Sequence, residues 1–315
     1  MCVKIDIVGK RYWWFALSLL FILPGLFSIV TEGLKLGIDF TGGTIWELQM
    51  SKPVEPTQVK DVLAPFGYGD ALVQTSQNNG IIIRMKELKE GSDTKAQISA
   101  AMTAKFGTFK ELELQSVGPS LGVEIRNRAM VAIVLASIGV LIYIAYAFRN
   151  TQNPILYGIA AIIAMLHDVV ILIGIFSILG WVAGVEVDSL FVTAVLTVIG
   201  FSVHDTIVVF DRIRENLSHR AGRSFEEVVN YSVAQTVVRS LNTSLTVVFT
   251  LIALYLFGGE STRWFVFALL VGIVCGTYSS IFNASQVLVV WENREVHRFI
   301  ARLRGGLQRQ ATTRV

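Results

Sequence analysis

Six long apolar runs divide the sequence, and each is long enough to cross a membrane as a helix. About 20 consecutive apolar residues span the hydrocarbon core of a bilayer. The runs cover residues 13–30, 129–148, 155–182, 190–210, 241–257 and 264–291. They predict six transmembrane helices. The first run is longer than the apolar region of a typical secretory signal, and no A-x-A-like cleavage site follows it, so we expect a retained anchor.

The polar segment between the first two runs has the pattern of a small α+β domain. Strands are predicted at 44–50, 71–76, 81–86 and 110–117, and helices at 56–66 and 92–106. Asn78, Asn79 and Gly80 form a turn signal between the second and third strands. The order β-α-β-β-α-β is that of a ferredoxin-like sandwich.

The distribution of Lys and Arg predicts how the chain crosses the membrane. Basic residues gather before the first run, after the second and fourth runs, and in the tail. Because cytoplasmic loops collect Lys and Arg, we expect both termini in the cytoplasm and the polar segment outside the cytoplasmic (inner) membrane. Arg126 and Arg128 run against this trend, but they adjoin a long translocated segment, where charge has less influence.

The expected fold class is therefore an α-helical membrane protein of six transmembrane helices with an inserted extracytoplasmic α+β ferredoxin-like domain. The predicted parts are an N-terminus with the first helix (1–32), the outer domain (33–124), the remaining five helices (125–292) with a cytoplasmic loop (211–238), and a basic tail (293–315).

Composition agrees with this class and excludes others. Hydrophobic residues make up 53% of the chain and charged residues 16%, whereas soluble domains carry about 25% charge. The net charge of +3 follows from basic loops of a membrane protein and does not indicate nucleic acid. The two cysteines, Cys2 and Cys275, lie in unlike environments, so no disulfide framework is expected.

Asp205 is the most informative residue, because it interrupts an apolar run. A carboxylate at that depth costs on the order of 2.5–3.5 kcal/mol and is usually functional. Arg239 begins the next run at a similar depth, so the two side chains are expected to meet in the cytoplasmic third of the bilayer. Beside Arg239 the carboxylate would be ionised, and apart from it the acid would hold a proton. A proton pathway is one interpretation, and a static buried ion pair is the other.

Further polar residues lie near this predicted pair. On the fourth run, Thr197 is expected on the face of Asp205, with Ser202 three residues away. On the fifth run, helical spacing places one polar stripe on a single face, namely Arg239, Asn242, Thr243, Thr246 and Thr250. Small and polar residues also promote helix packing, which remains the alternative interpretation of such stripes.

The dipeptide His-Asp occurs twice, at 167–168 and at 204–205. Asp168 lies near the middle of the third run and is a second candidate for the pathway, with a structural hydrogen bond as the alternative. His204 is a candidate proton relay or a packing residue. Neighbouring residues point about 100° apart on a helix, and the i, i+3 or i+4 spacing of metal ligands is missing, so no metal site is expected.

Several catalytic motifs are absent from the sequence. It contains no phosphate-binding G-x-x-x-x-G-K-[ST] or G-x-G-x-x-G, and no G-x-S-x-G or H-E-x-x-H. We therefore expect no enzyme activity, no catalytic residues and no cofactor. Any work must come from an ion gradient.

The motifs resemble those of the SecF family, the smaller membrane subunits of SecD–SecF protein-export complexes. GIDFTGG at 37–43 is similar to one family signature, through Gly37, Asp39, Gly42 and Gly43. VGPSLG at 117–122, with Gly118 and Pro119, is similar to another. FSVHDTIVVFDRIREN at 201–216 is similar to the family's most recognisable stretch. A structural role for the GIDFTGG glycines, as a turn at the mouth of the first helix, remains open.

The resemblance implies half of an RND-type arrangement and a role in protein export. The family acts with SecD and uses the proton-motive force, a proton gradient, to draw unfolded preproteins out of the Sec translocon channel. Its key intramembrane acid and arginine match Asp205 and Arg239. Implied partners are SecD, the Sec channel, YajC/YidC-type accessory proteins, preprotein and membrane lipid, but no nucleic acid. Asn283 and Gln286 depart from the family, which often has an apolar residue and a proline there.

Two other functions remain alternatives. One is an RND-type exporter of small molecules or lipids, which would be expected to carry twelve spans and two outer domains in one chain. The other is a structural scaffold of the translocon without proton coupling.

Overall fold

Six helices of the structure are long and apolar enough to cross a membrane. The computed structural model describes residues 6–76, 78–88, 92–149, 151, 153–219 and 223–295. The spanning helices are α1 (Arg11–Thr31), α5 (Pro119–Ala147), α6 (Pro154–Ala183), α7 (Ser189–His219), α8 (Phe225–Phe257) and a last span formed by α9 (Arg263–Ser279), a π-helical turn η3 (Ser280–Ala284) and α10 (Ser285–Glu292). The six predicted spans are confirmed.

Two of these helices extend well beyond their apolar runs. The predicted loop 211–238 is mostly helix, because α7 continues to His219 and α8 already begins at Phe225. Charge pairs along one helix stabilise such polar extensions. Arg212 and Glu215, three residues apart on α7, approach to 2.6 Å. Ser224 caps α8 by accepting a hydrogen bond from the Glu227 amide at 3.3 Å.

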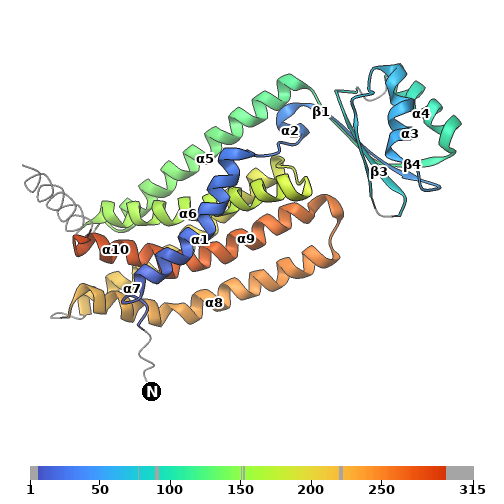
Figure 1. Cartoon of the computed structure of the whole chain (residues 1–315). Coiled ribbons are helices and arrows are strands. Elements are labelled where there is room, and N and C mark those ends of the chain that lie inside the picture. The colour runs from blue at the N-terminus through green and yellow to red at the C-terminus, as the bar shows by residue number, and fades with distance from the viewer. Residues whose placement is uncertain are drawn as a thin grey trace, which may run out of the picture. The chain divides into compact units, whose positions relative to one another are not determined.

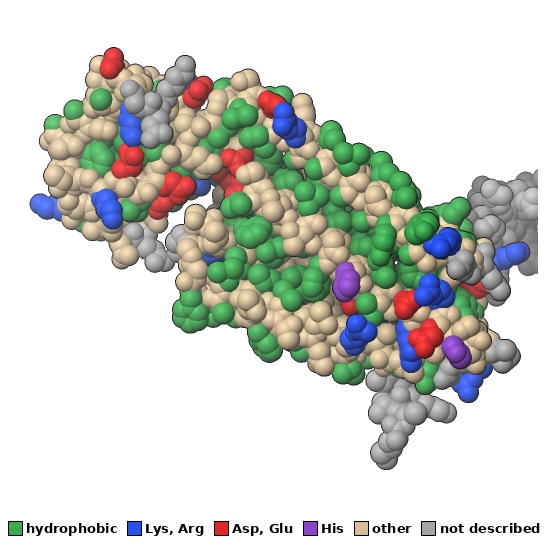
Figure 2. Space-filling model, turned by 180° about the vertical axis from the view of Figure 1, so that it is seen from behind, with side chains coloured by type: hydrophobic (Ala, Val, Ile, Leu, Met, Phe, Trp, Pro, Cys, Tyr) green, Lys and Arg blue, Asp and Glu red, His purple; other side chains and the backbone are tan. Residues whose placement is uncertain are grey.

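The helices α1, α6, α7, α8 and α9 form a bundle (Figure 1). One compact unit contains residues 1–34, 133–185 and 190–315, as far as these are described. Its core includes an aromatic cluster in which Tyr157 stacks on Phe148 at 5.1 Å and meets the edge of Phe210 at 5.2 Å. Figure 2 shows mostly hydrophobic side chains along the bundle, with charged ones gathered towards the α7–α8 end. This surface suits contact with lipid.

The helices α1 and α6 approach each other closely at two glycines. A Cβ atom added to Gly174 would lie 2.6 Å from the Cα of Gly25, so neither position has room for a side chain. Three residues further along each helix, the hydroxyls of Ser28 and Ser177 form a hydrogen bond of 2.8 Å. Small residues that allow such a backbone approach are typical of membrane helix interfaces.

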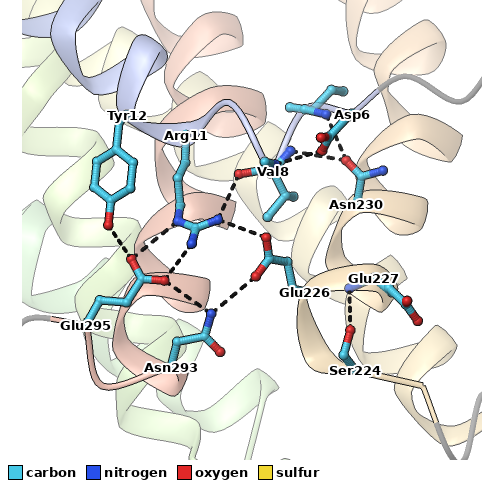
Figure 3. Close-up of polar contacts among 12 residues, drawn as sticks. Asp6, Val8, Arg11, Tyr12, Ser224, Glu226, Glu227, Asn230, Asn293 and Glu295 are labelled. Carbon is cyan, nitrogen blue, oxygen red and sulfur yellow. Dashed lines mark hydrogen bonds and ion pairs between the residues drawn. The ribbon is translucent and has the colours of Figure 1, made fainter. Parts of the chain in front are cut away.

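A cluster of charged and polar side chains lies at the α7–α8 end of the bundle (Figure 3). Arg11 donates from Nη2 to Glu295 Oε1 at 2.6 Å and from Nη1 to Glu226 Oε1 at 2.9 Å. Tyr12 donates its hydroxyl to Glu295 at 2.6 Å, and Asn293 donates to both glutamates. The cluster therefore joins the start of α1 to the start of α8 and to the segment after α10.

The second compact unit, which we call the inserted domain, contains residues 35–132 and 186–189. Its sheet has the order β2-β3-β1-β4, with every neighbouring pair antiparallel. The elements are α2 (Ile38–Thr41), β1 (Gly43–Met50), α3 (Pro56–Leu63), η1 (Ala64–Phe66), β2 (Leu72–Thr75), β3 (Gly80–Met85), α4 (Asp93–Phe106) and β4 (Phe109–Val117). Both α3 and α4 cover one face of the sheet (Figure 1). This confirms the ferredoxin-like fold.

Local chemistry explains these elements. Asn78 and Asn79 adopt positive φ angles of 54° and 59°, which the tight turn between β2 and β3 requires. Ser92 caps α4 by accepting from the Lys95 amide at 3.3 Å. Trp46 is fully buried between the sheet and its helices, and its indole nitrogen donates to Glu111 at 2.8 Å. The domain thus has its own hydrophobic core.

Residues 186–189, which connect α6 to α7, belong to the inserted domain although they lie far from it in sequence. Of the predicted basic tail at 293–315, only residues up to 295 are among those described.

Candidate functional site

Asp205 is buried in α7 and is held by the neighbouring helix α8. Its exposed fraction is 8%. Its Oδ1 accepts a hydrogen bond of 2.6 Å from the hydroxyl of Ser240, whereas its Oδ2 is buried without a partner in the described part of the chain. A buried carboxylate with one unsatisfied oxygen carries a large desolvation penalty. A proton on Oδ2, or a further partner there, would relieve this penalty.

Arg239 does not contact Asp205 in this structure, contrary to the contact expected from depth. Its side chain is exposed, and it forms no ion pair among the described residues. The reason is helix rotation: successive residues point about 100° apart, so the face that presents Ser240 to Asp205 turns Arg239 away.

The rest of the predicted stripe on α8 points outward with Arg239. Asn242, Thr243 and Thr246 are exposed, and the two threonines donate to backbone carbonyls of their own helix. A different row faces the bundle, spaced by four residues and made of Ser232, Thr236, Ser240 and Ser244. That four-residue spacing of small hydroxyl residues was visible in the sequence and was not used.

Asp168 forms a second buried carboxylate site, on α6. Its Oδ2 accepts hydrogen bonds from Ser202 at 2.6 Å and from Ser279 at 2.7 Å, and its Oδ1 lies 2.9 Å from Nδ1 of His167. Its exposed fraction is 1%. The side chains of His167 and Asp168 therefore do contact each other, which corrects the expectation from helical spacing. His167 also stacks near Tyr278 at 6.0 Å, and its Nε2 is buried without a hydrogen-bond partner in the described chain.

Ser202 thus contacts a predicted acid, although not the expected one. Instead of bonding Asp205 on its own helix, it donates to Asp168 across to α6. The hydroxyls of Thr206 and Ser280 meet at 2.9 Å, and Ser280 also donates to the Ser202 carbonyl at 3.2 Å. This hydroxyl network joins α6, α7 and the π-helical turn η3, and π-helical turns are frequent at functional sites.

Two other predicted residues on α7, Thr197 and His204, have exposed side chains. Thr197 is exposed and donates to the carbonyl of Thr193. Thr197 and Asp205 are eight positions apart, which amounts to about 80° beyond two full turns, so the two do not share a face as expected. His204 is also exposed. Among the described residues, no three His, Cys, Asp or Glu side chains gather as metal ligands.

The two motif segments of the inserted domain meet each other. Gly42 has a positive φ of 75°, and a Cβ atom there would lie 2.7 Å from the Cα of Pro119. Gly43, with φ of 133°, would clash in the same way with the carbonyl of Met85. Both glycines are therefore required by conformation and by close approach. Gly118 is less constrained, because its Cβ would make only ordinary contacts.

The other two motif residues contact the segment that precedes α7. The amide of Gly37 donates to the carbonyl of Val187 at 2.8 Å. Asp39 is buried, with 7% exposed, and accepts hydrogen bonds from the amide and the hydroxyl of Ser189. Asp39 therefore caps the first residue of α7.

Fold and site together define a multi-pass membrane protein with one inserted ferredoxin-like domain and buried carboxylates at helix contacts. The family described as "Protein export membrane protein SecD/SecF, C-terminal" matches residues 97–294, and "SecD/SecF GG Motif" matches residues 27–54. The chain belongs to the SecD/SecF family, on its SecF side.

Two sequence relatives and one solved structure illustrate this family membership. The "Protein translocase subunit SecF" of Thermobaculum terrenum is 57% identical over 308 residues, which are 95% of this chain and 97% of that one. The "Protein translocase subunit SecDF" of Bacillus subtilis is 34% identical over 94% of this chain but only 39% of its own length. The crystal structure of SecDF from Thermus, titled "a translocon-associated membrane protein", has a TM-score of 0.80 at 31% identity and covers 93% of this chain and 40% of that chain.

Proposed function

We propose that the chain, together with a SecD partner, uses the proton-motive force to promote export of preproteins across the cytoplasmic membrane. The observation that carries this proposal is Asp205, a buried carboxylate with one oxygen on Ser240 and the other unsatisfied. A static structural acid would be expected to satisfy both oxygens. An acid that exchanges protons needs a position where it can gain and lose a partner.

Arg239 is the partner that Asp205 can gain. It directly precedes Ser240, so a rotation of α8 about its axis by roughly one residue, about 100°, exchanges one for the other. The protonation state of Asp205 then follows its contact with Arg239. Asp168, with three hydrogen-bond partners in this structure, is proposed as a second proton site, and its partner Ser202 lies three residues before Asp205 on α7.

The exposed stripe on α8 supports the need for a partner within the membrane. An arginine within a span is costly when it faces lipid, by up to about 2.5–3.5 kcal/mol at the bilayer centre, and such residues almost always face protein or water. The chain spans about 40% of the solved SecDF chain and 39% of the Bacillus SecDF. A SecD-like subunit that covers the stripe completes the site. The Sec channel, YajC/YidC-type proteins and the unfolded preprotein are the further proposed partners.

The remaining parts of the proposal concern orientation and energy. Both termini and the α7–α8 connection lie in the cytoplasm, and the inserted domain lies outside, in accord with the Lys/Arg distribution. The proton gradient is the energy source, and no cofactor or enzymatic step is needed.

The test is Asp205→Asn in membrane vesicles that contain the full chain and its SecD partner. Completion of preprotein export is followed with the pH gradient and after an ionophore has collapsed it. Asp211→Asn is the matched control, because Asp211 is an exposed carboxylate on the same helix, paired with Arg214. We expect gradient-dependent export to fall at least tenfold in Asp205→Asn and to persist in the control.

Normal gradient-dependent export by inserted Asp205→Asn would contradict the proposal and favour a translocon scaffold. Gradient-driven efflux of a small molecule or lipid in the absence of preprotein would favour an exporter.

A further inference from the structure

The segment that connects α6 to α7 is bound to the inserted domain by its backbone. Val187 donates its amide to the carbonyl of Lys35 at 2.8 Å and accepts from the amide of Gly37 at 2.8 Å. Leu36 and Val187 thereby form a short parallel bridge. A Cβ atom on Gly37 would lie 3.2 Å from the Val187 carbonyl, so this contact also explains the glycine.

An ion-pair network binds the same segment through side chains. Glu186 lies 3.2 Å from Nε of Arg84, on strand β3, and 3.9 Å from Nζ of Lys35. The Glu186 side chain is only 15% exposed, and that of Arg84 is 22% exposed. Partly buried pairs of this kind are screened less by salt than surface pairs. The connection is thus joined to the sheet of the domain.

Asp39 adds a third attachment, at the first residue of α7. Its Oδ2 accepts from the Ser189 amide at 2.8 Å and from the Ser189 hydroxyl at 2.5 Å, while its Oδ1 accepts from Gln115 at 3.2 Å. A carboxylate at a helix N-terminus satisfies a free amide and interacts favourably with the helix dipole. Gln115 lies on strand β4, so Asp39 links α7 to the sheet as well.

The helix that begins at this attachment carries the proposed proton site. Without a break, α7 runs from Ser189 to His219, and Asp205 is the seventeenth residue of that helix. At 1.5 Å per residue, the two points lie about 24 Å apart along its axis. A helix is stiff over such a length, so displacement at one end reaches the other. Helix α5 also leaves the inserted domain without a break, but it carries no buried carboxylate.

We propose that Asp39 and Glu186 are positioning residues that fasten α7 to the inserted domain, so that movement of α7 driven by Asp205 is passed to that domain. This inference rests on the proposed function. It assigns to Asp39 of the GIDFTGG motif a role in coupling the two compact units, in addition to its contribution to the local fold.

The experiment uses the full chain with its SecD partner in vesicles and compares Asp39→Ala with Asp205→Asn. Two quantities are measured: gradient-dependent export, and the infrared carbonyl band of a protonated carboxylic acid, assigned to Asp205 by its loss in Asp205→Asn. Asp70→Ala is the control, since Asp70 forms an exposed ion pair with Lys86 in the same domain. We expect Asp39→Ala to retain the infrared band and to lose export at least tenfold, and the control to retain both.

A charge reversal separates coupling from a general loss of folding. Glu186→Arg and Arg84→Glu are each expected to reduce export at least fivefold, and the double variant is expected to recover to within about twofold of the parent. Recovery of export in the double variant would show that the ion pair between residues 186 and 84 is needed, because the reversed charges restore it.

Three results would overturn the inference. Normal export by Asp39→Ala, with export lost in Asp205→Asn, would refute the coupling role and leave the proposed function intact. Loss of both the infrared band and export in Asp39→Ala would assign Asp39 a purely structural role. Failure of the double reversal while both single variants insert normally would exclude the ion pair from coupling. Normal export by Asp205→Asn would instead refute the proposed function.

Discussion

Replacing Gly174 by alanine is expected to force α1 and α6 apart. The added Cβ would lie 2.6 Å from the Cα of Gly25, so the helices must separate by about 0.8 Å to reach an ordinary contact of 3.4 Å. The hydrogen bond between Ser28 and Ser177, now 2.8 Å, would then stretch to about 3.6 Å, which is beyond hydrogen-bonding distance. Both the packing and the polar contact of this interface would suffer.

The expected loss of stability follows from these two effects. Overpacking costs about 1–3 kcal/mol, and a hydrogen bond between membrane helices contributes about 0.6 kcal/mol on average. The gain in helix propensity from glycine to alanine offsets up to about 1 kcal/mol. We therefore expect Gly174→Ala to lower the free energy of unfolding by about 1–3 kcal/mol.

The assay is reversible unfolding in detergent micelles, titrated with a denaturing detergent and extrapolated linearly as for soluble proteins. Gly200→Ala is the control, because a Cβ at this position on α7 would meet nothing within 4 Å. The control should be unchanged or slightly more stable. If Gly174→Ala proves as stable as Gly200→Ala, the close approach of α1 and α6 is not as described.

Three further predictions use the same unfolding assay. Arg11→Ala should lower the free energy of unfolding by about 2–3 kcal/mol, because it leaves two facing carboxylates without their shared partner. Arg128→Ala is the control: it removes a surface ion pair whose arginine is 79% exposed, and it should cost less than about 0.5 kcal/mol. Equal losses in the two variants would show that Arg11 does not hold the two carboxylates together. Gln286→Met should stabilise by about 1–2 kcal/mol, since the buried Gln286 Oε1 lacks a hydrogen-bond partner in the described chain; a destabilised variant would indicate a partner. Burial opposes ionisation of Glu295, but the hydrogen bonds from Tyr12, Arg11 and Asn293 outweigh it and lower its pKa below the ordinary 4.5. The stabilisation from Glu295 should therefore be complete above about pH 4.5 and be lost as the pH falls through the lowered pKa, and Glu295→Gln should remove this pH dependence.

Features set by neighbouring residues could be predicted from the sequence. The six spans follow from run length, and the ferredoxin-like order follows from alternation and turn chemistry at Asn78 and Asn79. The caps at Ser224 and Ser92 are local in the same way, because the cap and the amide it satisfies lie three residues apart. These interactions are local, so a short window of sequence contains all the participants.

The rotation of each membrane helix could not be predicted in the same way. In a soluble protein a polar stripe faces water, but in a membrane it faces either its own bundle or another subunit. The stripe of Arg239 was therefore assigned inward, whereas the structure turns it outward and places Ser240 and Ser244 inside. Asn283 and Gln286, by contrast, face inward: both are buried within this chain, and Asn283 forms a hydrogen bond with Ser18.

Contacts between distant segments were also beyond a sequence pattern. Asp39 and Ser189 are separated by 150 positions, and nothing in either segment alone indicates that one caps the other. The two serines that hold Asp168 come from α7 and α9, which are likewise remote from α6 in sequence. Such sites depend on tertiary packing, which periodicity within single helices does not encode.

The most direct test of the central claim is proton entry during export. Vesicles that contain the full chain and its SecD partner, loaded with a pH-sensitive dye, are given a proton gradient and a preprotein, and the internal pH is followed through one round of export. We expect preprotein-dependent proton movement in the parent and at least a tenfold lower rate in Asp205→Asn. Equal proton movement in the two would show that Asp205 is not on the proton path and would contradict the account.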